Sequence, residues 1–241
     1  IMKLNTKFNY PKSIRAYYNG QRLYDIGNEK LPSVTTILSA TESEEKKASL
    51  ARWRQSVGQK QSEIISREAS SRGSKLHEIL ESFVLGKLNL DLLGDNSLEK
   101  LMADQIIENG IRNKLSEVWG VEATLAYSGH RGFAGAADLI GVYEGHETIL
   151  DFKQSNKPRK DEWNEDSYYL QLAGYSLCHN KTYGTNIDQG VILLCTKDLM
   201  FQRFVVDSER LKKFQQIFLD KVNQYYDCLL YTSPSPRDFE A

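Results

Sequence analysis

Two short apolar segments, each carrying one acid, constrain this chain more than any other feature of its sequence. The first reads Gly135-Ala136-Ala137-Asp138-Leu139-Ile140 and the second Ile149-Leu150-Asp151-Phe152-Lys153, with Glu144-Gly145-His146 between them. Apolar runs separated by a short turn that contains glycine are typical of a β-hairpin. Pairing of the two runs brings Asp138 opposite residues 151–153, so two carboxylates meet inside a sheet.

Asp138 and Asp151 need a nearby positive charge if both are ionised, because an isolated charged acid in a low-dielectric interior takes up a proton instead. A divalent cation would supply that charge. Lys153 stands two residues after Asp151 and therefore projects from the same face of the strand. A lysine beside metal-bound carboxylates can orient or help deprotonate a water molecule and can stabilise developing negative charge. The ordinary alternative is an Asp-Lys pair on a solvated strand face, and the apolar flanks of both acids argue against it.

The last helix expected before residue 85 places His77 and Glu81 four residues apart, beside its apolar stripe. His77 could then serve as a neutral imidazole ligand that Glu81 holds in place. The run His77-Glu78-Ile79-Leu80-Glu81 also resembles the HExxH pattern of zinc peptidases, but the second histidine is absent.

Three further residues lie on elements next to the predicted hairpin. Glu122 begins the preceding strand, where it either reaches the same ion or faces solvent. Gln171 and Tyr175 lie four apart on the helix that follows, where an amide and a phenol facing the sheet could hydrogen-bond a phosphate or Lys153. As isolated residues, the last two are also ordinary members of an amphipathic helix.

The remaining pattern predicts an α/β (α+β) fold, with a central mixed sheet flanked by helices. The expected elements are a mixed segment at 1–40 with a β-type run at 34–38, two or three helices within 44–85 broken at Gly58 and Arg72-Gly73, a helix at about 96–117, strands at 121–127, 132–143 and 148–153 as an antiparallel meander, a helix at 163–179, strands at 190–195 and 200–206, and a final helix at 208–226. We expect one domain over 1–228, with a helical elaboration at about 44–118 and a sheet core at about 119–206. The tail at 229–241 lacks periodicity and is expected to be disordered or artefactual.

The charge balance gives no general reason to expect nucleic-acid binding, because 31 Lys and Arg residues face 32 Asp and Glu residues. A basic site must therefore be local, and the densest cluster beside the hairpin is Lys157, Arg159 and Lys160. The sequence contains no apolar run of about 18 residues and no signal-like N-terminus, which predicts a cytoplasmic protein outside the membrane. Three widely spaced cysteines cannot alone form a disulfide framework or a four-cysteine metal site.

Five ordered elements together resemble the RecB-like branch of the PD-(D/E)xK nuclease superfamily. They are Arg72-Gly73-Ser74-Lys75-Leu76-His77 with Glu81, then Glu122, Gly135-Ala136-Ala137-Asp138, Asp151-Phe152-Lys153, and Gln171-Leu172-Ala173-Gly174-Tyr175. Within that branch the chain is similar to the mitochondrial genome maintenance exonucleases and to related exonucleases of bacteriophages. The resemblance covers roughly residues 10–206, and residues 31–38 with Trp53 and Val57-Gly58 look like the N-terminal region of the phage proteins.

The resemblance implies a restriction-endonuclease-like core and a metal-dependent DNA exonuclease. Its expected substrate is single-stranded DNA or DNA ends, in replication, repair or recombination within a bacterial or phage-infected cell. By this likeness Mg²⁺ or Mn²⁺ would be held by His77, Asp138, Asp151 and the Phe152 carbonyl. Lys153 would be the catalytic lysine, Glu122 would be the upstream acid, and the residues supporting the site would be Glu81, Gln171 and Tyr175. The residues in contact with DNA would be Arg72, Lys157, Arg159, Lys160 and Trp53. Some relatives carry an iron-sulfur cluster on four cysteines, which this chain lacks, so a cluster-free member is implied.

Two other classes of function stay open from the sequence. One is a catalytically silent DNA-binding protein of the same fold, against which the retained Asp138, Asp151 and Lys153 argue. The other is a zinc metallopeptidase built on the His77 helix, against which the missing third ligand argues.

Overall fold

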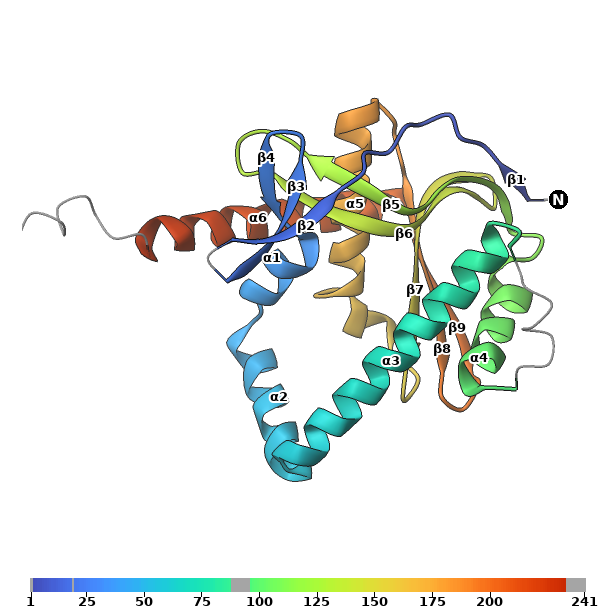
Figure 1. The fold of residues 1–241 in the computed structure, drawn as a ribbon, viewed down its shortest axis with the longest axis horizontal. Helices are drawn as coiled ribbons and strands as arrows, with labels where there is room; N and C mark the ends of the chain where they lie inside the picture. The colour runs from blue at the N-terminus through green and yellow to red at the C-terminus, as the bar shows by residue number, and fades with distance from the viewer. Residues whose placement is uncertain (1, 19, 88–95, 233–241) are drawn as a thin grey trace, which may run out of the picture.

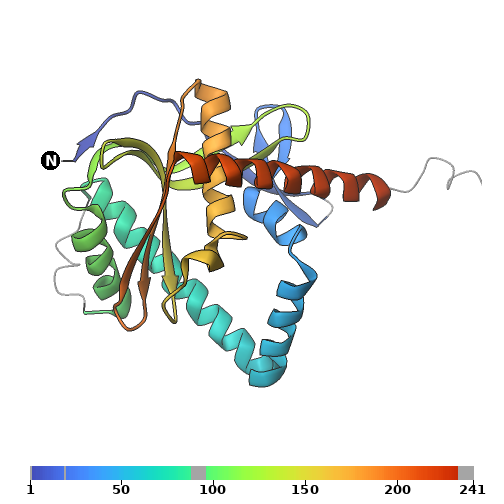
Figure 2. The same ribbon diagram turned by 180° about the vertical axis from the view of Figure 1, so that it is seen from behind.

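A six-stranded mixed sheet organises the chain, and helices cover both of its faces (Figure 1 and, from behind, Figure 2). The computed structural model describes residues 2–18, 20–87 and 96–232. The strands run in the order β1 (Lys3–Leu4), β5 (Leu115–Tyr127), β6 (Phe133–Tyr143), β7 (His146–Ser155), β8 (Gln189–Thr196) and β9 (Phe201–Val206). The predicted mixed α/β fold with a central sheet is confirmed.

The strand directions follow from the lengths of the connections. Strands β5, β6 and β7 form the predicted antiparallel meander, joined by short turns. Strand β7 pairs with β8 in parallel, and the crossover between them contains α5 (Tyr168–Tyr183). A parallel connection requires such a long crossover, whereas an antiparallel pair does not.

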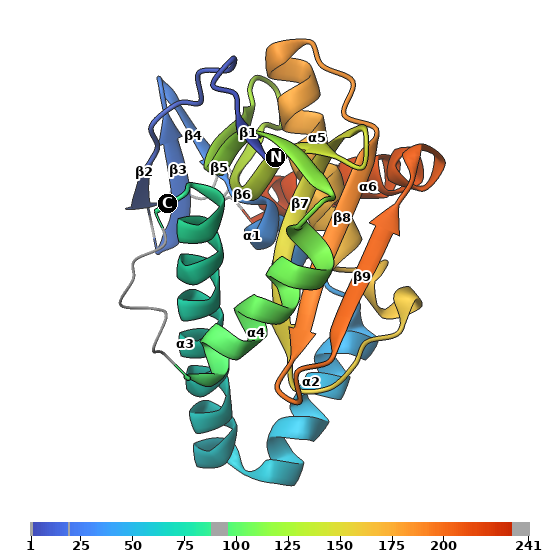
Figure 3. The ribbon, with the colours of Figure 1, turned by 90° about the vertical axis from the view of Figure 1, so that its right-hand side faces the viewer.

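Two apolar cores lie on opposite faces of the sheet, beneath the helices that Figure 3 shows on either side of it. On one face, α1 (Val34–Ala40), α5 and α6 (Ser208–Thr232) cover a core that includes Ile140 and Ile149. On the other face, α3 (Gln59–Val84) and α4 (Leu98–Ile106) cover Leu139 and Leu150. Burial on both faces explains why these strand segments are continuously apolar rather than alternating.

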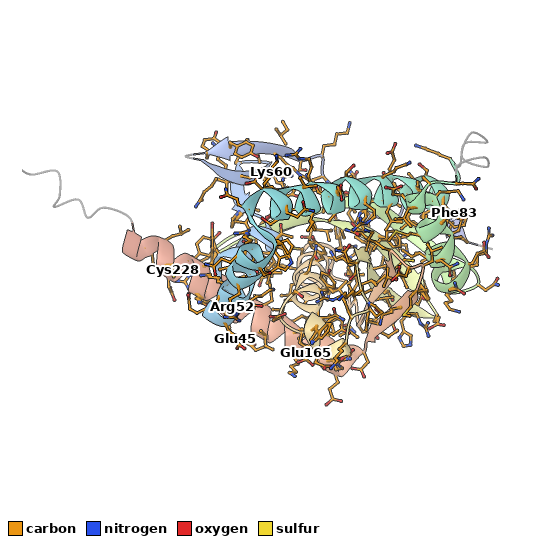
Figure 4. All side chains as sticks on the ribbon, turned by 90° about the horizontal axis from the view of Figure 1, so that it is seen from below. Glu45, Arg52, Lys60, Phe83, Glu165 and Cys228 are labelled. Atoms are coloured by element: carbon orange, nitrogen blue, oxygen red, sulfur yellow. The ribbon has the colours of Figure 1, made fainter. Side chains whose placement is uncertain are left out.

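Helices α2 (Glu44–Val57) and α3 form a V that projects away from the sheet. They meet at Gly58, whose φ of +84° is a conformation that favours glycine. Arg52 and Lys60 lie near this bend, and Phe83 lies at the far end of α3 (Figure 4). The predicted break at Arg72-Gly73 is wrong, since α3 runs through both residues without interruption.

Two other predicted elements differ from the structure. Residues 34–38 are not a strand but part of α1, because the Ser33 side chain accepts a hydrogen bond from the Thr36 N–H and caps a helix there. The helix predicted to reach residue 117 ends at Ile106, a π-helical turn covers Ile107–Ile111, and β5 begins at Leu115. Helix capping by Ser33 thus outweighs the β-branched run at 34–38. Sheet pairing of β5 outweighs the helical periodicity near residue 117.

The ends of the last two helices are also shifted. Helix α5 begins at Tyr168 instead of residue 163, after a short 3₁₀ helix over Asp161–Asn164. Helix α6 continues to Thr232, so residues 229–232 of the predicted tail are helical, and residues 233–241 lie outside the described part. No described helix combines the length and the apolar composition needed to cross a membrane.

A separate three-stranded sheet comes from the start of the chain. It consists of β2 (Ile14–Tyr18), β3 (Gln21–Ile26) and β4 (Glu29–Pro32), all antiparallel. Tyr24 and Leu31 of this small sheet are buried against Ala126 and Ala134 of β5 and β6. This contact fixes the small sheet beside the central sheet.

Candidate active site

Strands β6 and β7 part where the two predicted acids lie. Their pairing extends only from Tyr143 and His146 to Leu139 and Leu150. Beyond that point β6 pairs with β5, and β7 pairs with β8. We call residues 138–139 and 150–151 the strand fork. It leaves space between two neighbouring strands for the side chains of Asp138 and Asp151.

Main-chain groups of Phe152 at the fork are bound by side chains instead of by strand β6. The Phe152 N–H donates to Asp138 Oδ2 at 2.7 Å, and the Phe152 carbonyl lies 2.8 Å from His77 Nε2. His77 Nδ1 lies 3.4 Å from Asp138 Oδ1. Helix α3, β6 and β7 are thereby joined at one point, as the sequence predicted for His77 and the two acids.

The acid that contacts His77 is Asp138 and not Glu81, which corrects one expectation. Among the described residues Glu81 makes no hydrogen bond to His77, although both line a cleft of about 600 Å³ between α3 and the sheet. The same contact also affects the charge of His77 in the metal-free protein. Burial alone would lower the pKa of His77, but the hydrogen bond and charge of Asp138, with the charge of Asp151, raise it to about 9.

Lys153 is held from two sides. Its Nζ lies 2.5 Å from Asp151 Oδ2 and donates to Gln171 Oε1 at 2.9 Å, and Gln171 Nε2 donates to the Tyr175 hydroxyl at 2.9 Å. Burial opposes the charged amine, but Asp151 and Asp138 raise the pKa of Lys153, so it stays protonated. Gln171 of the predicted pair thus contacts the lysine, and Tyr175 contacts Gln171.

Gly135 makes room for this arrangement. A Cβ atom at residue 135 would lie 2.5 Å from Cε1 of Tyr175, which is closer than real side-chain contacts allow. Only glycine therefore lets the Tyr175 ring lie against β6 while its hydroxyl reaches Gln171.

Glu122 brings a third carboxylate to the fork from β5. Its neighbours Val121 and Ala123 pair with Leu139 and Ala137, so Glu122 lies alongside Asp138. Glu122 has a φ of +47°, a left-handed conformation that costs a non-glycine residue about 1–3 kcal/mol and is often found at functional sites. One ligand atom from each of His77, Glu122 and Asp138 lies within 4.8 Å of the others.

Burial and mutual repulsion leave the carboxylates short of positive charge. Burial and repulsion by Asp138 raise the pKa of Asp151, and the same two causes raise the pKa of Glu122. Burial would also raise the pKa of Asp138, but His77 overcomes it and lowers that pKa. Although Asp151 Oδ2 is ion-paired with Lys153, it has no well-oriented hydrogen bond from any described residue. This donor set of carboxylate oxygens and one imidazole fits a divalent ion.

The residues predicted to contact DNA do not all have free side chains. Arg72 is buried, and its guanidinium donates to Gln154 Oε1 and Asn156 Oδ1, so it ties α3 to β7 and the structure does not support a DNA contact. Arg159 donates to Asn164 Oδ1 and to the Trp163 carbonyl. The others are exposed or half-buried: Lys157, Lys160 and Trp53.

Two cations that the sequence analysis did not single out, Arg15 and Arg22, line a second cavity with Glu122 and Asp138. A signal for them exists in the sequence, because two β-type runs flank Gly20 and predict a hairpin. The hairpin itself says nothing about what its face packs against.

Sequence comparison finds three similar proteins, all named mitochondrial genome maintenance exonuclease 1. The human protein is 27% identical over 176 residues, covering 70% of this chain and 50% of its own length. The mouse protein is 27% identical over 204 residues, covering 81% and 59%, and the Xenopus tropicalis protein is 24% identical over 181 residues, covering 72% and 50%. The chain thus spans about half the length of the curated relatives it matches, and the similarity to this group expected from the motifs is confirmed.

Two other comparisons add less. No protein-family model matches the chain. A crystal structure of a candidate exonuclease from Eubacterium rectale aligns with a TM-score of 0.40 at 15% identity, covering 64% of this chain and 68% of that one. A similarity of that size supports no inference about function.

Proposed function

We propose that this chain is a metal-dependent DNA exonuclease that hydrolyses phosphodiester bonds. The observation that carries the proposal is the convergence at the strand fork of three carboxylates, one imidazole and one protonated amine. The names of the similar mitochondrial proteins support an exonuclease. We further propose single-stranded DNA or DNA ends as the substrate, and replication, repair or recombination as the setting.

The ion we propose is Mg²⁺ or Mn²⁺. Asp138, Asp151 and Glu122 offer the hard oxygen ligands that these ions prefer, and His77 and the Phe152 carbonyl lie in reach of the same point. When bound, such an ion polarises the phosphate and lowers the pKa of a coordinated water. Binding through His77 requires the imidazole to lose the proton that Asp138 stabilises.

Lys153 supplies fixed positive charge in this proposal. Because the pKa of its amine is raised by the two acids, the amine is not a base at neutral pH. It can instead stabilise negative charge that develops on the phosphate oxygens, and Gln171 and Tyr175 hold it in one orientation. Lys157, Lys160 and Trp53 remain proposed contacts to the DNA outside the fork.

The decisive experiment follows nucleotide release from end-labelled linear single-stranded DNA. The native protein should release nucleotides with Mg²⁺ or Mn²⁺ and none with a chelator, and Asp151→Asn and Lys153→Met should each lower the rate about 10²–10⁴-fold. Lys212→Met, on the exposed side of α6, is the matched control and should retain activity.

Three results would count against the proposal, each in a different way. Retained DNA binding without any release would indicate the catalytically silent DNA-binding protein. Cleavage of circular single-stranded DNA would show an endonuclease, and faster cleavage of an RNA strand of the same sequence would overturn the choice of DNA.

A further inference from the structure

Two openings beside the fork differ in charge. The cleft on the α3 side is lined by His77, Glu78, Glu81 and Glu122, with small residues and Gln154, and no Lys or Arg among the described residues. The cavity on the other side, about 250 Å³, is lined by Arg15 and Arg22 together with Glu122 and Asp138. Glu122 therefore lines both openings, and the opening that it shares with Asp138 carries the two arginines.

The small sheet sets the position of these arginines. Arg15 pairs with Tyr24 across β2 and β3, and Tyr17 pairs with Arg22. Directly opposed residues, and residues two apart along a strand, share one face, so these four side chains belong to the same face of the small sheet. Tyr24 is 5% exposed and packs on the central sheet, which turns this face toward the fork.

Both guanidinium groups are available to a ligand. Within the described part of the chain, neither Arg15 nor Arg22 forms an ion pair with a carboxylate, and both residues are exposed. The Arg15 guanidinium lies 5.4 Å from the Tyr24 ring centroid, and its charge acts against the other causes that raise the pKa of Glu122. The charge of Arg15 thus affects the pKa of Glu122, while its guanidinium N–H groups remain available to a ligand.

We infer that Arg15 and Arg22 form a phosphate subsite that binds the nucleic-acid strand next to the phosphate held at the fork. Guanidinium groups bind phosphate oxygens through paired donors, and a second phosphate of the strand is the anion that this cavity would meet. The strand therefore leaves the fork toward the small sheet and not into the acidic cleft, which repels it. This inference rests on the proposed nuclease function.

Tyr17 extends the subsite with a surface for a base. Its side chain is 75% exposed on the outer strand of the small sheet, on the same face as Arg15 and opposite Arg22. An exposed ring beside cations that hold phosphates is typical of proteins that bind single strands, because an unpaired base can stack on it. The subsite is accordingly suited to an unpaired strand.

The first test measures binding apart from cleavage. In a Lys153→Met background with Mg²⁺, a fluorescent single-stranded oligonucleotide is titrated at several salt concentrations. Arg15→Gln with Arg22→Gln should weaken binding about 10- to 100-fold and reduce the salt slope by about 1–1.5. Lys212→Gln with Lys213→Gln on α6 removes the same charge and should change affinity less than about twofold. If both double variants lost affinity equally, the loss would come from the net charge of the protein, and the subsite would be overturned.

Charge-preserving variants guard against a folding artefact. Arg15→Lys with Arg22→Lys should restore the salt slope but only part of the affinity, because an ammonium lacks the paired donors of a guanidinium. Tyr17→Ala should weaken single-strand binding about tenfold and leave the salt slope unchanged. Full affinity in the lysine variant would overturn the paired-donor geometry, and unchanged affinity in Tyr17→Ala would overturn the stacking surface.

The second test uses the active protein. If the subsite binds the strand, Arg15→Gln with Arg22→Gln should raise KM about tenfold with a smaller change in kcat. Unchanged KM in a working nuclease would overturn the subsite alone. Absence of nuclease activity in the native protein, together with a lost salt slope in the arginine variant, would overturn the proposed function and leave the subsite standing.

Discussion

Two histidines of this protein, one half-buried and one fully buried, have opposite surroundings. His77 at the fork lies against Asp138 and near Asp151, and its pKa is raised to about 9. His179 on α5 is fully buried, with the Tyr10 hydroxyl 3.0 Å from Nε2 and the Thr185 hydroxyl 2.7 Å from Nδ1. Burial, and to a lesser extent Lys7, lowers the pKa of His179 to about 4.

The difference in surroundings indicates that His77 belongs to a candidate site and His179 to the packed core. The ring of His179 contacts Phe8, Trp119 and Tyr183, so its two nitrogens have neutral partners and it packs as an uncharged ring. His77 instead carries a proton that partly offsets surplus carboxylate charge. The His179 region is complete without a ligand, whereas the fork gathers more carboxylate charge than His77 and Lys153 offset, which agrees with the proposed metal site.

The largest expected effect tests the fork side of this contrast. His77→Ala should lower nuclease activity about 10²–10⁴-fold and metal affinity at least about 10-fold, because one ligand is lost. Without metal, this variant should also unfold at a lower temperature near neutral pH, because the ion pair with Asp138 is lost as well. Metal titration by calorimetry and nucleotide release measure the two losses, and full metal affinity in this variant would contradict the assigned ligand.

The next effect tests the core side. His179→Ala should lower the free energy of unfolding by about 3 kcal/mol, because it leaves a cavity among four aromatic rings and two hydroxyl groups without their partner. Metal affinity per folded molecule should stay within about twofold of the native value. Urea unfolding and metal titration together check this, and a selective loss of metal binding would erase the contrast between the histidines.

The pH dependence of stability should show both histidines, with opposite signs. His179 has a folded pKa of about 4, below its value of 6.5 in the unfolded chain, so its contribution is full above about pH 6.5 and is lost as the pH falls toward 4. The loss amounts to about 3 kcal/mol. His77 has a folded pKa of about 9, so in metal-free protein its contribution is full below about pH 6.5 and is lost as the pH rises toward 9.

Urea unfolding from pH 4 to 9 with a chelator measures both limbs. In His179→Phe the free energy of unfolding should depend less on pH in the acid range, and in His77→Gln it should depend less on pH in the alkaline range. A steep acid limb in His179→Phe would assign that dependence to other groups.

The smallest effect concerns repulsion within the fork. Glu122→Gln removes a carboxylate whose pKa is raised by burial and by Asp138, so the metal-free protein should gain about 0.5–1 kcal/mol of stability. The same variant should bind Mg²⁺ more weakly. Thermal melts with and without Mg²⁺ measure both changes, and a loss of stability would mean that Glu122 makes a favourable contact that outweighs the repulsion.

The sequence predicted the parts of the fork that depend on neighbouring residues. The apolar runs and the Gly145 turn were sufficient for the hairpin, and the spacing of Asp151 and Lys153 put both on one face. The parting of β6 and β7 is a property of the whole sheet, since it depends on which strand each continues to pair with. No local pattern contains that information, and the partner of His77 was misassigned to Glu81 for this reason.

Errors elsewhere also came from longer-range contacts. The sequence predicts a DNA contact at Arg72 because it shows the charge of this residue, but it does not show the burial of Arg72 against Gln154 and Asn156. No local pattern connects Arg15 and Arg22 with the acids, because about 100 residues or more separate them in the sequence. The packing of Tyr24 on the central sheet brings the two arginines close to Glu122 and Asp138. The types of the residues thus indicate what chemistry their side chains can do. They indicate where the side chains lie in the fold only within locally paired segments such as the β6–β7 hairpin.

The fork also bears on which ions the protein would accept. Asp138 and Asp151 are anchored on strands whose remaining neighbours hold them through main-chain hydrogen bonds, so the spacing of the two carboxylates cannot adjust without unzipping β5 or β8. A scaffold of this kind discriminates by ionic radius: Mg²⁺ coordinates at about 2.0–2.1 Å and Ca²⁺ at about 2.3–2.6 Å with more ligands. At the proposed metal site, strands held in this way would favour the smaller ion, and we expect Ca²⁺ to bind there more weakly than Mg²⁺.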